Sequence, residues 1–128
     1  MAIGVITGLD HVSLLVRNTA RALEFYTGIL GLSQDEARPD LGYAGAWLQT
    51  GNGQIHLIEL PSPDPIEGRP AHGGRDRHTA LRVSDLDVIT SALDAAGVGY
   101  TLSRSGRRAL FCRDFDANAL ELVEKPAL

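Results

Sequence analysis

The stretch DHVSLLV at residues 10–16 decides the fold of this chain, because it returns half a chain later as RHTALRV at residues 77–83. In both copies a histidine follows a charged residue and opens a short apolar run. A second pair of stretches, QIHL at residues 54–57 and ALEL at residues 119–122, repeats at nearly the same spacing. An internal repeat determines the architecture of the whole fold. The sequence therefore predicts two related halves, each with one ligand-type residue near its start and one near its end.

Length, composition and charge indicate one soluble domain, residues 1–128, with neither a nucleic-acid nor a membrane partner. The 128 residues can bury a core, and 44% hydrophobic and 22% charged residues are ordinary for a globular protein. A net charge of −4 offers nucleic acid no basic field. No stretch approaches the roughly 18 apolar residues of a membrane span, and residues 1–8 do not resemble a signal peptide. The lone Cys112 cannot form an internal disulfide and favours a reducing compartment, so we expect a cytoplasmic protein.

The first half, about residues 9–60, is predicted to begin with a strand and a helix. Alternation in residues 10–16 directs one set of side chains toward a helix-covered face and leaves the histidine on the opposite face; the covered set is Val12, Leu14 and Val16. A helix is expected to follow an N-cap at Asn18 or Thr19 and to stop at Gly31. Its buried stripe is predicted at helical spacing by Ala22, Phe25, Tyr26 and Ile29.

Strands and a long linker complete this half. Residues 46–49 and 54–60 read as a hairpin around the turn at 51–53, preceded by a weak, polar strand within residues 32–36. Prolines and glycines dominate residues 61–77, which excludes a helix or a central strand. We expect this segment to be a crossover linker, with a functional lid as the alternative.

The second half, residues 78–124, repeats the pattern more clearly. The strand at residues 78–83 is predicted to turn Thr79, Leu81 and Val83 toward the covered face. Residues 84–87 resemble a capping box with aspartate in the usual glutamate place, followed by a helix that closes at Gly97 and has the stripe Leu86, Ile89 and Leu93. Three strands are then expected, at residues 100–102, 109–113 and 119–124.

Four residues in or at the start of strands share one chemistry: His11, His56, His78 and Glu121. If a pseudo-twofold axis relates the halves, all four can converge on one point. Imidazole and carboxylate are ligands for a borderline divalent metal, and two histidines with one carboxylate leave coordination positions open. A lone histidine at a strand start is more often structural, but two at matched repeat positions favour a metal site.

Structural interpretations remain open for several of these residues and their neighbours. His56 is the least secure ligand, because beside Glu59 it can form a simple surface pair. His72 in the linker is expected to be solvated. Trp47 and Phe111 occupy matched positions and are expected to be core or pocket wall, and Cys112 is expected to be a buried structural residue rather than a nucleophile.

Three stretches of the sequence resemble one family. LDHVSL at residues 9–14 and ALEFYTGILGL at residues 22–32 are similar to the opening of the vicinal oxygen chelate superfamily, which includes glyoxalase I, bleomycin-resistance proteins, fosfomycin-resistance thiol transferases and extradiol dioxygenases. RDFDANALEL at residues 113–122 resembles its Asp-Pro-Asp-Gly-Asn-x-Leu-Glu-Leu signature, with Phe115 and Ala117 in place of the usual proline and glycine. This departure suggests a less tight turn.

The resemblance implies an α+β fold of two βαβββ modules that form a U-shaped, mixed β-sheet around a divalent metal ion, with nickel, cobalt, zinc, manganese and iron left open. Small members are usually homodimers with sites at or near the subunit interface. By position, His11, His78 and Glu121 match the most widely shared metal ligands, and His56 falls where glyoxalase I supplies a glutamate. Glu121 would also be the catalytic base.

Departures from the family pattern bear on the substrate. Leu15 and Leu60 stand where glyoxalase I carries groups that hold glutathione, whereas Ser13 matches a hydroxyl that thiol transferases use for substrate binding. Arg82 projects from the second histidine strand as a candidate for binding an anionic substrate group, and a salt bridge to Asp85 or Asp87 is the alternative. Trp47 is a further candidate for substrate contact. Other positive charges expected nearby are Arg38, Arg107 and Arg108.

Three functions compete on this evidence. The first is a metal-dependent, glyoxalase-like lyase or isomerase that acts on a small substrate with adjacent oxygens. The second is a non-catalytic protein that sequesters a ligand, of the bleomycin-resistance type, and the presence of all four ligand-type residues disfavours it. The third is a non-haem iron dioxygenase, which ranks lower because a fourth ligand at His56 would occupy a position that oxygen or substrate needs.

Overall fold

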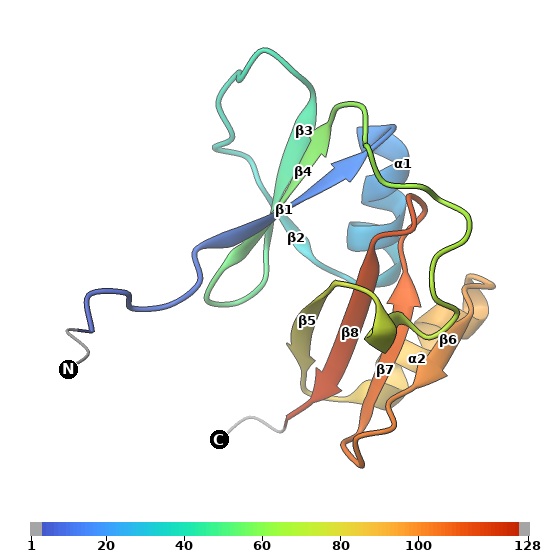
Figure 1. Cartoon of the computed structure of the whole chain (residues 1–128). Helices are drawn as coiled ribbons and strands as arrows, with labels where there is room; N and C mark the ends of the chain where they lie inside the picture. Colours follow the sequence, from blue (N-terminus) through green and yellow to red (C-terminus); the bar gives the residue numbers. More distant parts are fainter. Residues whose placement is uncertain (1–3, 126–128) are drawn as a thin grey trace.

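The computed structural model describes residues 4–125, which form two similar modules of one helical segment and four strands each (Figure 1). The first module contains β1 (His11–Val16), α1 (Thr19–Leu23), the π-helical η1 (Glu24–Ile29), β2 (Ser33–Asp35), β3 (Gly45–Gln49) and β4 (Gln54–Glu59). The short 3-10 helix η2 (Gly73–Arg75) lies in the linker. The second module contains β5 (His78–Val83), α2 (Leu86–Ala95), β6 (Tyr100–Leu102), β7 (Ala109–Arg113) and β8 (Ala119–Glu124).

The two modules have the same strand topology, as the repeat predicts. Strand order is β1-β4-β3-β2 in one four-stranded sheet and β5-β8-β7-β6 in the other. In each sheet the first strand pairs in parallel with the last, and the other pairs are antiparallel. The register is also the same, since Ser13 lies opposite His56 and Ala80 lies opposite Glu121. The predicted α+β fold of two βαβββ modules is confirmed.

One hydrophobic core lies between the helical segments and the covered faces of both sheets. Its largest fully buried side chains come from both modules and include Phe25, Tyr26, Leu48, Leu93 and Leu110, each at 0% exposure. Burying such a side chain contributes about 1.5–3 kcal/mol, so this shared core is the main reason that the modules fold together. The alternation predicted for the first histidine strand is correct, because Val12, Leu14 and Val16 belong to this core or pack against it. In the second strand Leu81 and Val83 pack against the core as predicted, whereas Thr79 lines two cavities beside β1.

Each helix start is held by a glutamate from the last strand of its own module. Glu59 Oε1 accepts a hydrogen bond from the backbone N–H of Thr19 at 2.7 Å, and Glu124 Oε1 accepts one from Leu86 at 2.9 Å. Asn18 is the first N-cap, as predicted. The second N-cap is Asp85, whose side chain accepts from the N–H of Asp87. The expected capping box is therefore wrong, because Asp85 rather than Ser84 is the N-cap, and Glu124 bonds from a strand to the N–H of Leu86.

The turn between β7 and β8 joins the two modules. The Tyr26 hydroxyl donates to Asp114 Oδ2 at 2.6 Å, and the Asn118 side-chain amide donates to the backbone oxygen of Leu15 at 3.0 Å. Burial raises the pKa of Asp114 although this tyrosine and Asn118 donate to its carboxylate. The turn stays closed despite the missing proline and glycine, since the N–H of Ala117 bonds to the Asp114 carbonyl at 3.1 Å. Ala117 adopts a left-handed conformation, with φ of 66°.

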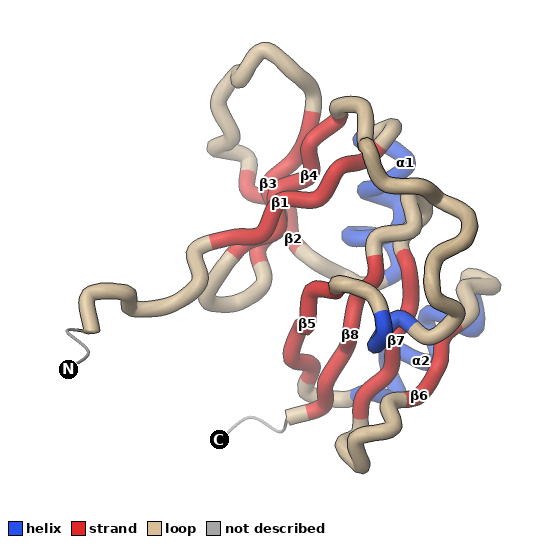
Figure 2. Tube along the Cα trace, viewed as in Figure 1, coloured by secondary structure: helices blue, strands red, loops and turns tan. Residues whose placement is uncertain are grey.

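The linker between the modules lies against the second sheet. Figure 2 shows it running as a loop to η2, which contacts β7 and β8. Gly73 permits this approach, because a Cβ atom at that position would lie 3.2 Å from Cβ of Phe111. Asp76 fixes the end of the linker through salt bridges to Arg69 and Arg113, both at 2.8 Å. Among the described residues, no helix combines the length and the apolar character needed to cross a bilayer.

Candidate metal centre

The four predicted ligands lie as two pairs, one on the uncovered face of each sheet. His11 and His56 belong to β1 and β4, and His78 and Glu121 belong to β5 and β8. The register is the same in both sheets, because Ser13 lies opposite His56 and Ala80 lies opposite Glu121. His11 and His78 each lie two residues earlier on the neighbouring strand, and side chains two residues apart on a strand share a face. The repeat therefore brings together two residues in each module.

The first pair is a stack of aromatic rings. The imidazoles of His11 and His56 are parallel with centroids 3.9 Å apart, and Trp47 stacks on the other side of His56 at 4.4 Å. His56 Nε2 lies 2.8 Å from Gln54 Oε1, and the Gln54 amide nitrogen donates to Asp35 at 2.9 Å. Gln54 thus accepts from His56 Nε2, which leaves Nδ1 of that ring with a lone pair. Burial, with the neighbouring His11, lowers the pKa of His56 and favours its neutral form.

The second pair is an ionic cluster. His78 Nε2 lies 3.3 Å from Glu121 Oε1, and Arg107 Nη2 lies 3.1 Å from Glu121 Oε2. The Glu121 side chain is only 5% exposed, so its carboxylate is almost fully removed from water. Phe111, the residue matched to Trp47, packs edge-on against His78 with centroids 5.0 Å apart. Both aromatic residues are therefore walls beside a ligand-type side chain, as the sequence predicts.

His11 and His78 present the same ring nitrogen for coordination. His11 Nδ1 bonds to Asp10 Oδ2 at 2.7 Å, and His78 Nδ1 bonds to the backbone oxygen of Asp76 at 2.9 Å. A carboxylate or carbonyl oxygen that accepts a hydrogen bond from Nδ1–H leaves the Nε2 lone pair available to a metal. This arrangement, with the buried carboxylate of Glu121, has the donor chemistry of a divalent-metal site.

The expected convergence of all four ligands on one point does not occur within a single chain. Across residues 4–125, no cluster of three or more histidine, cysteine, aspartate or glutamate side chains could hold a metal ion. The physical reason is that the repeat builds one pair in each sheet, and the two sheets are separate. A complete ligand set would need both uncovered faces to meet, which one chain alone does not provide.

The seam between β1 and β5 contains the predicted substrate-binding residues of the histidine strands. His11 and Arg82 line one cavity of about 390 Å³, and Ser13 and His78 line another of about 290 Å³. Asp87, an alternative partner of Arg82, instead accepts from Arg108 at 3.2 Å. Arg82 is exposed and therefore accessible to a ligand.

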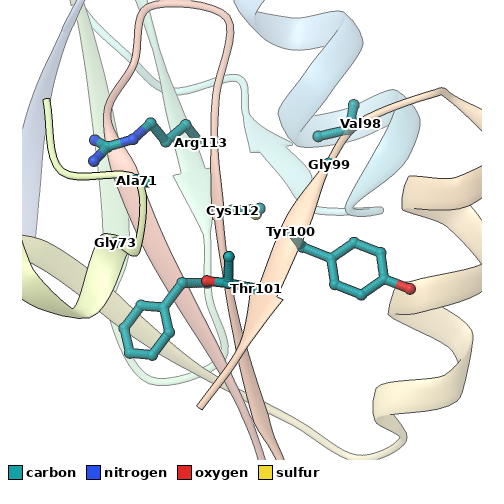
Figure 3. Close-up of a pocket in the computed structure, with 9 residues that line it drawn as sticks. Ala71, Gly73, Val98, Gly99, Tyr100, Thr101, Cys112 and Arg113 are labelled. Atoms are coloured by element: carbon teal, nitrogen blue, oxygen red, sulfur yellow. The ribbon is translucent and has the colours of Figure 1, made fainter. Parts of the chain in front are cut away.

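A third cavity lies between the linker and the edge of the second sheet. Its volume is about 320 Å³, and Figure 3 shows Arg113 extending toward the linker while Tyr100 points away from it. The guanidinium of Arg113 is already occupied, because it donates to Asp76, to the backbone oxygen of Ala117 and to that of Pro70. This cavity offers a ligand no free charge and is separate from the metal-ligand pairs.

Several residues have roles that the sequence did not reveal. His72 is not simply solvated, since its Nδ1 lies 2.7 Å from Thr101 Oγ1 and its ring packs on Phe111. Arg107 is the cation beside Glu121. The sequence could have indicated this, because Arg107, Ala109 and Phe111 alternate and therefore share one face of the strand. Cys112 is buried as predicted, and burial raises its pKa to about 12, which excludes a ready thiolate.

Comparisons with known proteins place these features in a family. A model of the "Glyoxalase/Bleomycin resistance protein/Dioxygenase superfamily" matches residues 8–122. Glyoxylase I 4 of Arabidopsis thaliana is 30% identical over 95 residues, which are 74% of this chain and 55% of that protein. The chain thus spans about half the length of this curated relative.

Solved structures show the same fold at lower identity. A glyoxalase family protein from Bacillus anthracis has a TM-score of 0.81 and 22% identity, with 97% of this chain and 99% of that chain covered. The fosfomycin resistance protein FosX from Listeria monocytogenes, solved with Mn(II) and a dihydroxypropylphosphonic acid, has a TM-score of 0.74 and 21% identity over 97% and 95%. TnmS3, an antibiotic binding protein from Streptomyces, has a TM-score of 0.73 and 20% identity over 96% and 98%.

Proposed function

Because the chain belongs to the glyoxalase/bleomycin resistance protein/dioxygenase superfamily, we propose that it is a divalent-metal-dependent, glyoxalase-like enzyme. The reaction is proton transfer, of the lyase or isomerase type, on a small substrate with adjacent oxygens. The observation that carries this proposal is the His78–Glu121 pair, in which an oriented imidazole lies 3.3 Å from a buried carboxylate.

The residues have separate roles in this proposal. His11, His78 and Glu121 hold the ion through Nε2 atoms and a carboxylate oxygen, and a bound divalent ion supplies Lewis acidity. Glu121 Oε2 takes a proton from the substrate as general base. Ser13, Trp47 and Arg82 contact the substrate. His56 is the weaker ligand, because its Nε2 donates to Gln54 and only Nδ1 is left for an ion.

A homodimer completes the site in this proposal. One copy supplies His11 and His56 from its first module, and the second copy supplies His78 and Glu121 from its second module. Two observations support this arrangement: the pairs lie on separate sheets, and each pair is on the face that the helices leave uncovered. A second copy would also cover the edge strands of both sheets.

A complementation experiment tests the shared site. Chains with His11→Ala and chains with Glu121→Ala are purified, mixed after unfolding and refolded together. In a heterodimer, a shared arrangement leaves one site intact and one doubly altered, so each heterodimer binds one ion at its two sites. If each chain forms its own site, every site lacks a ligand and no metal returns. A monomer in light scattering with metal bound would also contradict the shared site.

The substrate class is tested by assay with different metals. We expect little or no turnover of the methylglyoxal–glutathione hemithioacetal, because Leu15 and Leu60 provide no polar contact for glutathione. The assay is repeated with nickel, cobalt, manganese and zinc. Efficient isomerisation with any of them would identify an ordinary glyoxalase I and contradict the expectation from these two leucines.

A metal-free binding protein is the second candidate, and the stack of His11, His56 and Trp47 favours it. Parallel rings at 3.9 Å and 4.4 Å form a flat aromatic surface to which a planar ligand can add. TnmS3, which shares the fold, is an antibiotic binding protein. Metal analysis of the purified protein separates the candidates, since the enzyme requires an ion and the binding protein does not.

A further inference from the structure

The carboxylate of Glu121 already has a cationic partner in the metal-free chain. Arg107 Nη2 lies 3.1 Å from Oε2, while His78 faces the other oxygen. The exposures of the two partners differ greatly: the Glu121 side chain is 5% exposed and that of Arg107 is 55% exposed. A buried carboxylate without a cation is strongly unfavourable. Arg107 therefore reaches inward from solvent to a charge that cannot move outward.

A ladder of serine hydroxyls in the β6–β7 hairpin orients this arginine. Ser103 Oγ and Ser105 Oγ are 2.8 Å apart, and Ser105 Oγ accepts from both the backbone N–H and the Nε–H of Arg107 at 3.3 Å and 3.2 Å. Nε is fixed by the hairpin and Nη2 by Glu121. The Nη2 end of the guanidinium can therefore leave the carboxylate while Ser105 still holds Nε.

The neighbouring Arg108 shows what a purely structural arginine does here. Its Nε bonds to Glu124 at 2.6 Å and its Nη2 to Asp87 at 3.2 Å, which ties the hairpin to the start of α2. Neither acceptor is a predicted metal ligand. Arg107 differs because its single acidic partner is the carboxylate that the proposed ion would also use.

We propose that Arg107 is the counter-ion of Glu121 in the metal-free protein, that a divalent ion displaces it, and that the displaced guanidinium binds an anionic oxygen group of the substrate. This inference rests on the proposed function. The ion neutralises Glu121 and repels a second cation, so the contact at 3.1 Å is lost. The planar guanidinium suits bidentate contact with a carboxylate, phosphate or phosphonate. Arg107 thereby becomes a specificity residue at the edge of the site.

The test compares Arg107→Gln with Arg107→Lys and with the control Arg104→Gln. Arg104 is exposed on the same hairpin, so its substitution removes the same charge without touching Glu121. Calorimetry measures binding of Mn(II) to each metal-free protein, and then binding of inorganic phosphate to each Mn(II)-loaded protein. Thermal unfolding with and without Mn(II) gives a readout that needs neither activity nor substrate.

Arg107→Gln should bind Mn(II) several-fold more tightly than wild type, because the competing cation is gone. Its metal-free form should unfold at a lower temperature than metal-free wild type. Addition of Mn(II) should raise its unfolding temperature by more than it raises that of wild type. Phosphate affinity should fall by about tenfold or more, the size expected for a lost charged hydrogen bond. Arg107→Lys should be intermediate, and Arg104→Gln should stay within about twofold of wild type on the energy scale of an exposed charge.

Distinct results would overturn the inference and the proposed function. If wild type binds Mn(II) but Arg107→Gln matches Arg104→Gln in both affinities, the role of Arg107 is wrong and the metal site stands. Weaker Mn(II) binding by Arg107→Gln would show that the arginine supports the ion rather than competing with it. If neither wild type nor Arg107→Gln binds Mn(II), both the metal function and the inference are wrong.

Discussion

The two modules have the same backbone and different chemistry at matched positions. Both place a histidine at the start of the first strand and a second ligand-type residue on the last strand in the same register. In the first module this second residue is His56, within a stack of aromatic rings. In the second it is Glu121, within a buried ionic cluster.

This difference teaches that the repeated backbone sets where a side chain lies, while the residue type sets what it can do. In the first module the rings are held mainly by stacking, whereas the buried carboxylate of the second module requires a cationic partner. We therefore expect metal affinity and charge-dependent stability to depend more on the second module than on the first. Four predictions test this asymmetry.

The largest effect is expected at the ionic cluster. Glu121→Ala should lower metal affinity by roughly 100-fold or more, because losing one of few ligands removes a large part of the binding free energy. His78→Ala and His11→Ala should behave similarly. Metal content after dialysis and calorimetric titration measure the effect. A His78→Ala protein that retains full metal content would refute the assignment of the ligands.

The matched glutamates at the helix starts give the next prediction. Glu59→Gln should lower stability by about 1 kcal/mol, as for a weakened N-cap, and Glu124→Gln should lower it further because Arg108 also loses its partner. Hydrogen bonds from Arg108 and from the N–H of Leu86 lower the pKa of Glu124. A lowered carboxyl pKa stabilises the fold above the unfolded value, roughly 4.3, and this contribution is lost as the pH falls through the folded pKa.

Denaturant unfolding at neutral and acidic pH measures the contribution of each glutamate to the free energy of unfolding. The difference between wild type and Glu124→Gln should shrink as the pH falls below about 4, where the wild-type carboxylate becomes protonated. Equal losses for the two variants at pH 7 would contradict the asymmetry, because Arg108 would then contribute nothing.

A smaller effect is expected at the ring stack. His56→Ala should weaken metal binding only several-fold, comparable to the loss of a residue that positions a ligand, because His56 supports the His11 ring and its Nε2 is bonded to Gln54. His56→Gln is the matched polar control. A loss as large as that of Glu121→Ala would identify His56 as a full ligand and remove the contrast between the modules.

The smallest effect is expected at the hairpin turns that precede the last strands. The turn of the first module has glycine in the left-handed region, Gly51 with φ of 96°, whereas the second has Ala117 with φ of 66°. An L-residue in this region costs about 1–2 kcal/mol that glycine avoids, although glycine adds unfolded-state entropy. Ala117→Gly should therefore raise stability by about 0.5–1 kcal/mol, measured by denaturant unfolding. A loss of stability would mean that the methyl group packs favourably.

Local patterns predicted the elements of this fold well, and contacts between elements less well. Alternation around His11 and His78 gave both the strands and their covered faces, since side-chain direction in a strand depends only on the backbone. The N-cap of α2 is Asp85 rather than Ser84, since both residues are good N-caps and local sequence does not separate them. The contact from Glu124 comes from a strand far away in the sequence. The apolar stripe also does not distinguish the π-helical η1 from an ordinary α-helix.

For the candidate site, the sequence predicts candidate residues but not how they are grouped. The repeat identifies His11, His56, His78 and Glu121, but only the sheets show that they form two pairs. The roles of Asp10, Asp76 and Gln54 as partners of the imidazoles depend on side-chain geometry that spacing does not encode.

The glutamates that hold the helix starts make each ligand position exchangeable. Glu59 and Glu124 stand three residues after His56 and Glu121 on the same strands, and they anchor each last strand to its helix by a hydrogen bond that does not involve the ligand side chain. The backbone at each ligand position is therefore held in place by contacts that do not depend on the ligand side chain. Placing a carboxylate at position 56 or an imidazole at position 121 would change the donor set of the proposed metal site and leave the docking of the helices intact.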